Sequence, residues 1–501
     1  MRIKTKMLRR EFILFFIIFF LKTILVFSAS IDINIIKKTY FDSVESFKLE
    51  NGLKVVLIKK NSAPIVSCRI IYKVGSRFEE TGYTGISHML EHMMFKGTKK
   101  LGTKDYKLDS LVWVKIDSLY PLMMNFLENS DSLMYKRVKN EYDSLMNINN
   151  KIAIKNHYFL LMDKEGAQDV NAYTTKDGTF YFATLPKNKL ELFFATESDR
   201  MINSTFREFY TERSVVREER RRRYENRPRG MAWEKLIAYS YISHPYRNPV
   251  IGWGDDIENY TIDYLRSYYK KYYAPNNAIL VVVGDIDFNK TKKLINKYFS
   301  HIPSSHIERR HITKESIHHE ERRIKLDVKA EPFVYLSYNI YKNSVKDNVI
   351  LDLIETILSG GNSSLIYREL IKKKKIVVSG DAFYYTLKDP GLFVFTFTPS
   401  ENIKVDSVIV ELDSLLCRIK SGKIDDYQIG RAKNVMYNYY IRQFEGFSSM
   451  NSLVGWYELI YEDWRYILKY LEILDSITKD DIIKKANEVF KKENRTIVYV
   501  E

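Results

Sequence analysis

Apolar and polar positions alternate with two different periods along the chain, which predicts a mixed α/β fold. Residues 47–58 contain two apolar runs around Asn51-Gly52, the pattern of a β-hairpin, and residues 65–74 predict a further strand. Residues 333–340 predict a strand and residues 349–358 a helix. The second half therefore repeats the strand-then-helix order of the first, as expected of two related domains.

Residues 105–156 interrupt this order with a longer apolar repeat. Leucine, isoleucine, valine and methionine recur there at helical spacing on both sides of residues 128–131. This pattern predicts two long antiparallel helices, a hairpin that projects from the surface of the first domain. Apolar and polar residues alternate again from Asn171 to Ala183, which predicts a strand.

The first 30 residues have the composition of an export signal. Five basic residues precede an apolar run at residues 12–21, and small residues at 28–30 suit a cleavage site. An uncleaved anchor in the inner membrane is the alternative, although Lys22 interrupts the apolar stretch 12–27. We therefore expect an exported, periplasmic protein that meets a membrane only through this segment, if the segment is retained.

Length, charge and cysteine content narrow the class of protein. A chain of 501 residues with 45% apolar content is large enough for two or more globular domains. The formal net charge is +16, but basic residues are interleaved with acidic ones and no nucleic-acid-binding motif occurs, so no nucleic-acid partner is expected. The two cysteines, Cys68 and Cys417, are too few and too far apart for a disulfide scaffold or a cysteine-based zinc framework.

The motif that runs from His88 to His92 carries the most specific chemical signal. Residues four apart lie on one face of a helix, so both imidazoles can reach one Zn²⁺ ion. Glu91 lies one turn after His88 and points toward the same metal, where it can take a proton from water. Gly85 and Gly97 flank the motif, and the apolar residues around the histidines predict a buried helix.

A catalytic zinc site needs a third protein ligand and an open position for water. The best candidate lies at residues 212–219, because Glu212 and Glu219 are two helical turns apart and share one face. We assign Glu219 as the ligand and Glu212 as the group that orients the site. Glu218, one residue earlier and on another face, is the competing ligand. A charged, solvated helix without a site is the alternative.

Together with further segments, these residues resemble the insulinase/pitrilysin family, in the branch near mitochondrial processing peptidase and its bacterial relatives. The likeness extends over nearly the whole chain after residue 45, and its segments follow in family order: residues 85–98, 171–174, 212–219, 244–252, 272–278 and 281–285. The resemblance implies that one zinc ion is held by His88, His92 and Glu219. It also implies that Glu91 is the catalytic base and that Glu212 supports the site.

The resemblance implies a clamshell of two homologous α/β domains, each a mainly antiparallel sheet with helices on one face. We expect the zinc-bearing domain at residues 45–303, with the hairpin 105–156 as an insertion, and a second domain without a metal site at residues 323–501. The charge-dense segment 304–322 has the composition of a linker. Its histidines are expected to be solvated: His306, His311, His318 and His319.

In the family, the strand that begins near residue 171 binds an extended peptide along its edge. Asn171 and Ala172 are therefore expected to touch a peptide or unfolded polypeptide substrate. Family members that act alone carry an arginine and, seven residues later, a tyrosine, where this chain has Ile371 and Val378. In family heterodimers a zinc-less subunit supplies that pair, so we expect a homologous partner.

The predicted function is a zinc-dependent endopeptidase with Glu91 as general base. Two alternatives come from other classes. The first is a non-catalytic scaffold or binding subunit of a peptidase-like heterodimer, and the intact set of predicted ligands argues against it. The second is a basic protein that binds polyanionic surfaces, for which steeply salt-dependent binding would be the evidence.

Overall fold

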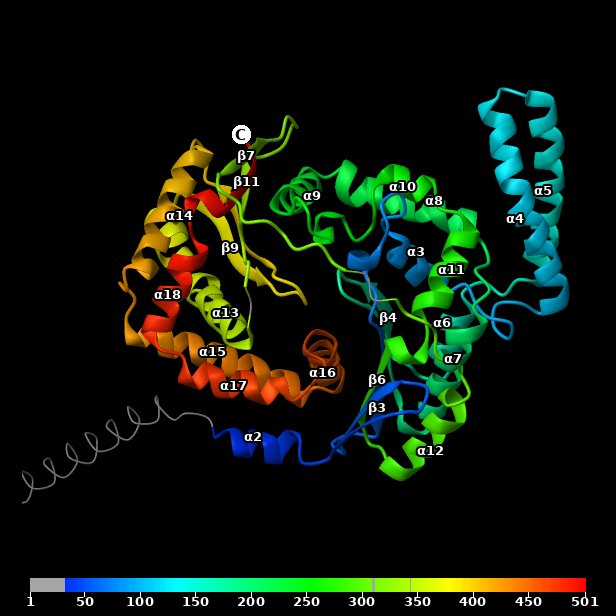
Figure 1. The fold of residues 1–501 in the computed structure, drawn as a ribbon, viewed down its shortest axis with the longest axis horizontal. Coiled ribbons are helices and arrows are strands. Elements are labelled where there is room, and N and C mark those ends of the chain that lie inside the picture. The colour runs from blue at the N-terminus through cyan, green and yellow to red at the C-terminus, as the bar shows by residue number, and fades with distance from the viewer. Residues whose placement is uncertain (1–31, 309–310, 343) are drawn as a thin grey trace, which may run out of the picture.

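The computed structural model describes residues 32–308, 311–342 and 344–501, so the predicted export segment 1–30 lies outside the described residues. Within the described residues there are two separate β-sheets, one in each half of the molecule (Figure 1). The strands are β1 (Val44–Lys48), β2 (Lys54–Lys59), β3 (Ile65–Tyr72), β4 (Gln168–Thr174), β5 (Thr179–Pro186), β6 (Ala278–Gly284), β7 (Arg322–Lys325), β8 (Phe333–Asn339), β9 (Val377–Tyr385), β10 (Leu392–Pro399) and β11 (Arg495–Val500).

The two sheets repeat one arrangement of strands. The first sheet has the order β1-β2-β6-β3-β5-β4 and the second has the order β7-β11-β8-β10-β9. When β1 is set aside, the strands of the two sheets correspond one to one in these orders. In each sheet the first two of these strands run parallel to each other, β2 with β6 and β7 with β11. The neighbouring pairs that remain are antiparallel. The prediction of two mainly antiparallel sheets in related halves is therefore confirmed. The domain boundaries given from the sequence stay a prediction.

Helices surround both sheets and separate them. The helices of the first half are α2 (Ile33–Tyr40), α3 (Ile86–Met93), α4 (Tyr106–Glu128), α5 (Ser132–Ile152), α6 (His157–Lys164), α7 (Leu190–Asn203), α8 (Phe209–Arg220), α9 (Pro228–Ser240), α10 (Gly254–Glu258), α11 (Ile262–Tyr272) and α12 (Phe288–Phe299). Those of the second half are α13 (Val345–Ser359), α14 (Val405–Lys420), α15 (Asp426–Glu445), α16 (Phe447–Tyr461), α17 (Tyr466–Ser476) and α18 (Lys479–Val489). One π-helical segment, η4 (Arg221–Glu225), follows α8, and a second, η7 (Ile366–Lys373), precedes β9.

Each half sends one helix across to the sheet of the other half, which the sequence did not reveal. Helix α16 packs against β3 and β6, and helix α9 packs against β8 and β11. The side chain of Asn451 on α16 donates to the carbonyls of Ser67 and Val281, at 2.7 and 3.0 Å, and accepts from Arg69 at 3.1 Å. These buried hydrogen bonds tie the second half to the first sheet, because polar groups buried at such a contact are costly when unpaired.

The predicted hairpin 47–58 and the predicted helical insertion are both present. Gly52 has a φ of +92° in the turn between β1 and β2, a conformation that glycine adopts at little cost. Helices α4 and α5 form the antiparallel pair and meet at residues 129–131, and Figure 1 shows them projecting from the first half. Their shared core is small, and several of the apolar positions that defined the repeat are exposed, such as Leu111 and Ile148.

Two sequence predictions are wrong. Residues 171–183 do not form one strand, because the chain reverses at residues 175–178 between β4 and β5. The signal was present, since Asp177-Gly178 is a turn dipeptide. His318 is buried rather than solvated, with its Nε2 atom 3.0 Å from Glu315 Oε1. Glu315 also accepts the backbone N–H groups of residues 242–244, which fixes this part of the connecting segment against the first half.

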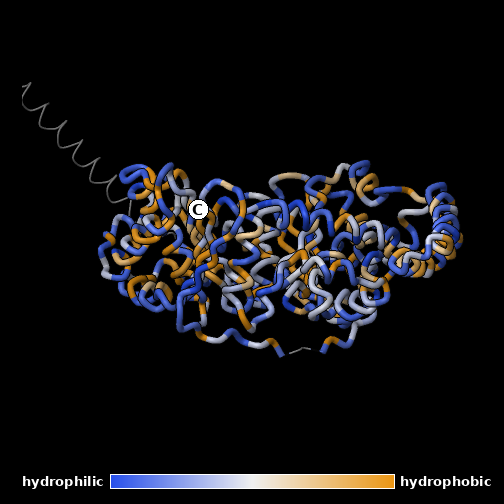
Figure 2. Tube along the Cα trace, turned by 90° about the horizontal axis from the view of Figure 1, so that it is seen from above, coloured by the Kyte–Doolittle hydropathy of each residue, from blue (hydrophilic) through white to orange (hydrophobic). Residues whose placement is uncertain are grey.

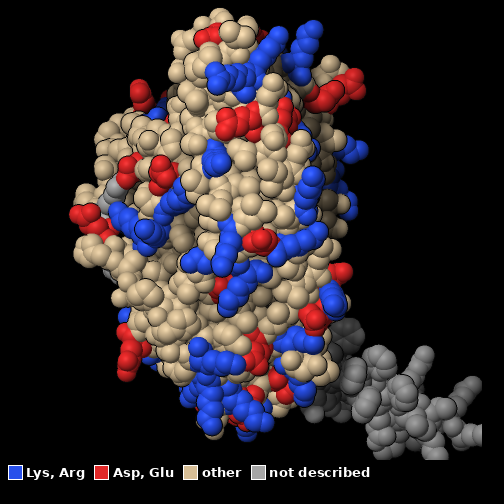
Figure 3. Space-filling view, turned by 90° about the vertical axis from the view of Figure 1, so that its right-hand side faces the viewer, with Lys and Arg blue, Asp and Glu red and all other residues tan. Residues whose placement is uncertain are grey.

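Apolar stretches run through the interior of both halves (Figure 2). The outer face seen from the side of the α4–α5 hairpin carries lysine and arginine scattered among aspartate and glutamate (Figure 3). None of the helices in the described part of the chain combines the length and apolar character that crossing a membrane requires.

Candidate metal centre

Helix α3 presents His88, Glu91 and His92 in the first half. It begins after Gly85, whose φ is +90° and where a Cβ atom would come within 2.2 Å of the Ile251 carbonyl oxygen. The carboxylate of Glu79 accepts the backbone N–H groups of Gly85 and Ser87, at 2.6 and 2.9 Å, and so completes the first turn. A rigid, buried helix therefore carries both imidazoles, as the sequence predicted.

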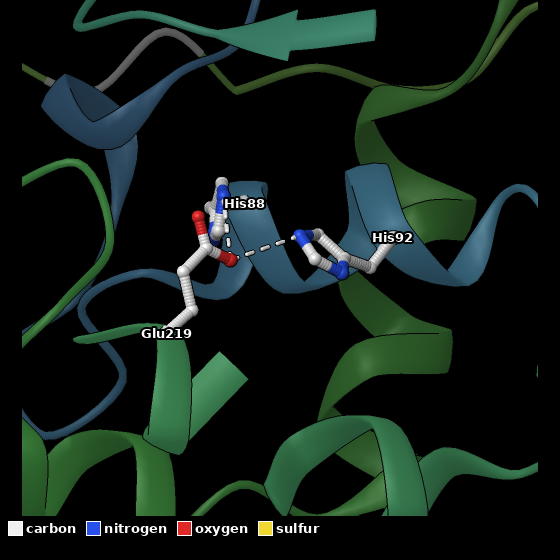
Figure 4. Close-up of side chains that lie close together, drawn as sticks. All are labelled: His88, His92 and Glu219. Carbon is white, nitrogen blue, oxygen red and sulfur yellow. Dashed lines mark ion pairs between the residues drawn. The ribbon is translucent and has the colours of Figure 1, made fainter. Parts of the chain in front are cut away.

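Helix α8 brings the third group to them. Phe209, Tyr210 and Val216 bury one face of this helix, and Glu212 and Glu219 lie buried on it as well. Glu219 Oε2 lies 3.9 Å from His88 Nε2 and 3.5 Å from His92 Nε2 (Figure 4). The structure thus brings together, from two helices, the three residues that the sequence singled out.

The donor atoms of His88, His92 and Glu219 all lie within 4.8 Å of one another. Two imidazole nitrogens and one carboxylate oxygen are a donor set that suits Zn²⁺, and three protein ligands leave a position open for water. His88 Nδ1 is buried and has no hydrogen-bond partner among the described residues. The Nε2 atoms of both histidines face Glu219, so the residues present fit a single zinc ion.

Glu212 lies behind His92 rather than beside the donor atoms. Its Oε1 atom is 2.8 Å from His92 Nδ1, and its Oε2 atom is 2.6 Å from Lys96 Nζ. Such a carboxylate fixes the ring orientation and tautomer of a ligating histidine. Glu218, the competing ligand, is half exposed and pairs with Arg221 at 2.8 Å, away from the histidines.

Glu91 lies on α3 next to the donor group and close to strand β4. Thr174 Oγ1 donates to Glu91 Oε2 at 2.6 Å. Burial raises the pKa of Glu91 above its ordinary value, while the hydrogen bond from Thr174 and the charge of His92 act in the opposite direction. A carboxylate with a raised pKa is better suited to take and return a proton near neutral pH.

The protonation states of the donor groups follow from burial and from their partners. Burial and the neighbouring His92 lower the pKa of His88 to about 3, so its imidazole is neutral and free to bind a metal. Burial also opposes a charge on His92, but hydrogen bonds to Glu212 and Glu219 outweigh it and raise the pKa of His92 to about 9. A metal bound at Nε2 would displace the proton from that nitrogen. Burial disfavours the charged form of Glu219, yet His92, His88 and Arg223 lower its pKa to about 2.

Asn171 and Ala172 lie on β4, the strand at the edge of the first sheet. Asn171 is exposed and Ala172 is half-buried, and their partners on β5 are Phe182 and Tyr181. Helix α3 packs against this strand, so the edge of the sheet runs directly past the residues that could hold a metal. An edge strand offers unpaired backbone N–H and C=O groups to an extended peptide.

Comparison with known protein families decides the class of this chain. The family model described as "Insulinase (Peptidase family M16)" matches residues 54–109 and 145–253, and the model described as "Peptidase M16 inactive domain" matches residues 259–436. The chain belongs to the insulinase family, peptidase family M16. The first model passes over residues 110–144, which form most of the projecting hairpin α4–α5.

Relatives of this M16 chain are named as proteases or peptidases. It is 29% identical to "Zinc protease PqqE" of Helicobacter pylori over 479 residues, which cover 92% of this chain and 94% of the relative. It is 22% identical to "Mitochondrial-processing peptidase subunit beta" of Saccharomyces cerevisiae over 472 residues, which cover 90% of this chain and 89% of the relative.

Solved M16 structures share its fold. The crystal structure of a protease from Helicobacter pylori superposes with a TM-score of 0.76 at 27% identity, covering 92% of this chain and 99% of that one. The periplasmic protease PqqL from Escherichia coli superposes with a TM-score of 0.68 at 18% identity, covering 92% of this chain and 48% of PqqL. At that identity, the likeness to PqqL shows the fold alone.

Three residues at the M16 site were missed from the sequence. Thr174 bonds to Glu91, Lys96 bonds to Glu212, and Arg223 Nη1 lies 3.0 Å from Glu219 Oε1. Lys96 and Arg223 each lie one helical turn from a predicted site residue, His92 and Glu219, so the four-residue spacing was an available signal. Thr174 comes from another element and had no such signal.

Proposed function

We propose that this M16 chain is a zinc-dependent endopeptidase that hydrolyses peptides or unfolded polypeptides. The grouping of two imidazoles and one carboxylate beside Glu91 and an open sheet edge is the observation that carries the proposal. His88, His92 and Glu219 hold one zinc ion, and Glu212 orients His92 through the hydrogen bond to Nδ1. A zinc ion bound there would polarise the scissile carbonyl and lower the pKa of a water molecule toward ~7.

Glu91 is the general base in this mechanism. It accepts a proton from the attacking water and then delivers that proton to the leaving amine. Thr174 holds one oxygen of the carboxylate, which leaves the other oxygen for the transfer. Asn171 and Ala172 bind the substrate backbone as an added strand along β4, so the scissile bond is positioned with little demand on side-chain sequence.

Substitution of Glu91 by glutamine tests the proposal. The variant should retain zinc, because Glu91 is not a ligand, and should lose ~10²–10⁴-fold in the turnover of an unfolded protein such as casein. Zinc content by elemental analysis and turnover are measured on protein purified mildly enough to retain any bound subunit. Glu218→Gln, a half-exposed neighbour of Glu219, is the matched control and should behave as the parent. Turnover retained in Glu91→Gln would reject Glu91 as the base.

A homologous partner subunit is the second part of the proposal. Ile371 packs against the core of the second half and Val378 is 66% exposed at the start of β9, so neither supplies a charged or hydroxyl group there. The yeast relative is named as one subunit of a processing peptidase, which supports a divided site. The chain purified to homogeneity should therefore be much less active than with its partner. Full activity of the single chain would contradict this.

We also place the protein outside the cytoplasm. The composition of residues 1–30 supports export, and the structural neighbour PqqL is titled a periplasmic protease. The non-catalytic scaffold remains the alternative to the enzyme. Zinc bound at the site together with loss of turnover in Glu91→Gln would decide against it.

A further inference from the structure

The second half contains a cavity of about 570 Å³ that the proposed hydrolysis does not use. Helices α13, α15 and α16 and strand β9 line it. Asp352 and Glu355 of α13 and Asp381 of β9 contribute carboxylates to its wall. Its volume lies in the range of sites that bind small molecules or single side chains.

Two of these carboxylates accept hydrogen bonds from neighbouring elements. Asp352 accepts from the Tyr470 hydroxyl, and Glu355 Oε2 accepts from the Tyr384 backbone N–H at 2.7 Å. Within the part of the chain that the structure describes, none of the three carboxylates is paired with lysine or arginine. Burial, together with the adjacent carboxylate, raises the pKa of Asp352 to about 8 and that of Glu355 to about 7. A positive group in the cavity would relieve the cost of charging them.

The shape of the cavity favours an organic cation over a metal ion. Among the described residues, the carboxylates of the cavity do not converge closely enough to form a three-ligand group like that of His88, His92 and Glu219. The rest of the wall is rich in aromatic rings, including Tyr439, Trp456 and Tyr461. Aromatic faces attract ammonium and guanidinium groups by cation–π interaction, and carboxylates beside them add direct charge pairing.

The cavity also adjoins the strand that borders the metal centre. Trp456 of its wall stacks near Phe180, with ring centroids 6.3 Å apart, and Phe180 stacks on Tyr173 at 4.5 Å. Tyr173 lies on β4 directly after Ala172. Rings from α16, β5 and β4 therefore form a continuous apolar contact from the cavity wall to the predicted substrate edge. Tyr439, on the α15 side of the wall, is 53% exposed, so the cavity opens to solvent.

We infer that this cavity binds the ammonium or guanidinium group of a basic side chain in the polypeptide substrate. The inference rests on the proposed function in one respect, namely that the substrate is a polypeptide. Asp352, Glu355 and Asp381 pair with the cation, and the aromatic wall covers the apolar stem of the side chain. The cavity thereby adds a preference for a positive charge to an edge strand that by itself binds only the peptide backbone.

Peptide binding tests the inference without relying on turnover. The probes are N-acetylated peptides that carry a single arginine at successive positions, each matched by the same peptide with citrulline. They are titrated by fluorescence anisotropy against the full chain bearing Glu91→Gln, which prevents cleavage. At the position that reaches the cavity, the arginine peptide should bind ~10-fold more tightly than its citrulline match.

Removal of the cavity charges should abolish this preference. The double variant Asp352→Asn with Glu355→Gln keeps the shapes of both side chains and should bring the arginine-to-citrulline ratio close to one. The matched control, Asp426→Asn with Glu401→Gln, removes the same charges from exposed positions of the same half and should retain the preference. Tyr439→Leu, at the exposed wall, should weaken the preference by ~3-fold and serves as a second variant if the double variant does not fold.

Equal binding of arginine and citrulline peptides at every position would overturn the inference. So would a preference that survives both the double variant and Tyr439→Leu, because recognition would then lie elsewhere. If the parent shows no casein turnover but its variants report the charge preference as expected, the proposed hydrolysis is rejected and the assignment of the cavity stands.

Discussion

The two halves of the molecule place different chemistry on the same scaffold. In the first half, α3 follows β3 and packs against the edge strand β4; in the second, α13 follows β8 and packs against the edge strand β9. Each helix carries a pair of polar residues three apart, His88 with Glu91 and Asp352 with Glu355. In each half the second member accepts a hydrogen bond from the edge strand, from the Thr174 hydroxyl or the Tyr384 backbone N–H.

The difference lies in what surrounds each pair. In the first half, α8 packs against α3 and brings Glu219 within ion-pair distance of both histidines, which closes a small set of donors suited to a metal. In the second half, aromatic rings stand around the carboxylates and leave a cavity of about 570 Å³. The shared scaffold thus fixes where a polar pair meets the edge strand, and the neighbouring elements decide whether a metal ion or an organic cation fits.

Loss of one imidazole should remove the metal site of the first half, and with it the difference between the two halves. His92→Ala leaves the first half with one histidine and one carboxylate, so zinc affinity should fall by more than ~100-fold, beyond the effect expected for loss of an outer partner. Competition against a chromophoric zinc chelator measures the affinity. His311→Ala, at an exposed position, is the control and should bind zinc as the parent does. Unchanged zinc binding in His92→Ala would place the metal elsewhere and end the comparison.

Glu212→Gln should have a smaller effect in the same assay. The amide retains a hydrogen bond to His92 Nδ1 but loses the negative charge that strengthens this histidine as a ligand, so zinc affinity should fall by ~10–100-fold. Glu218→Gln on the same helix should leave the affinity unchanged. Equal effects of the two variants would show that the charge of the helix, rather than its contact with His92, matters for the metal.

The sequence predicted the parts of this comparison that depend on local spacing. Four-residue spacing placed His88 and His92 on one helix, seven-residue spacing placed Glu212 and Glu219 on another, and the apolar repeats located the hairpin α4–α5. Contacts between distant elements had no such signal. Thr174 reaches Glu91 only because β4 pairs with β5 and then passes α3. Asn451 reaches the first sheet only because α16 crosses between the halves.

His318 shows the same limit within the connecting segment. A charge-dense composition predicts solvent exposure on average, but Glu315 accepts three backbone N–H groups from residues 242–244 and also contacts His318. Burial of one histidine is then a consequence of where the segment lies against the first half. Composition cannot report a tertiary contact of this kind.

Protonation of Glu315 provides the smallest expected effect and tests how firmly the segment is attached to the first half. Burial disfavours its charge, but the hydrogen bonds from His318 and from the N–H groups of residues 242–244 lower its pKa to about 2, from 4.5. A folded-state pKa below the unfolded value stabilises the protein above pH ~4.5, and this contribution disappears as the pH falls toward ~2. Glu315→Gln should therefore lower the free energy of unfolding by ~1–3 kcal/mol at pH 6, as expected for loss of a charged acceptor. Urea unfolding of parent and variant at pH 6 and pH 3 measures the difference in the free energy of unfolding, which should shrink at the lower pH. A difference that stays constant would show that the carboxylate charge does not hold the segment in place.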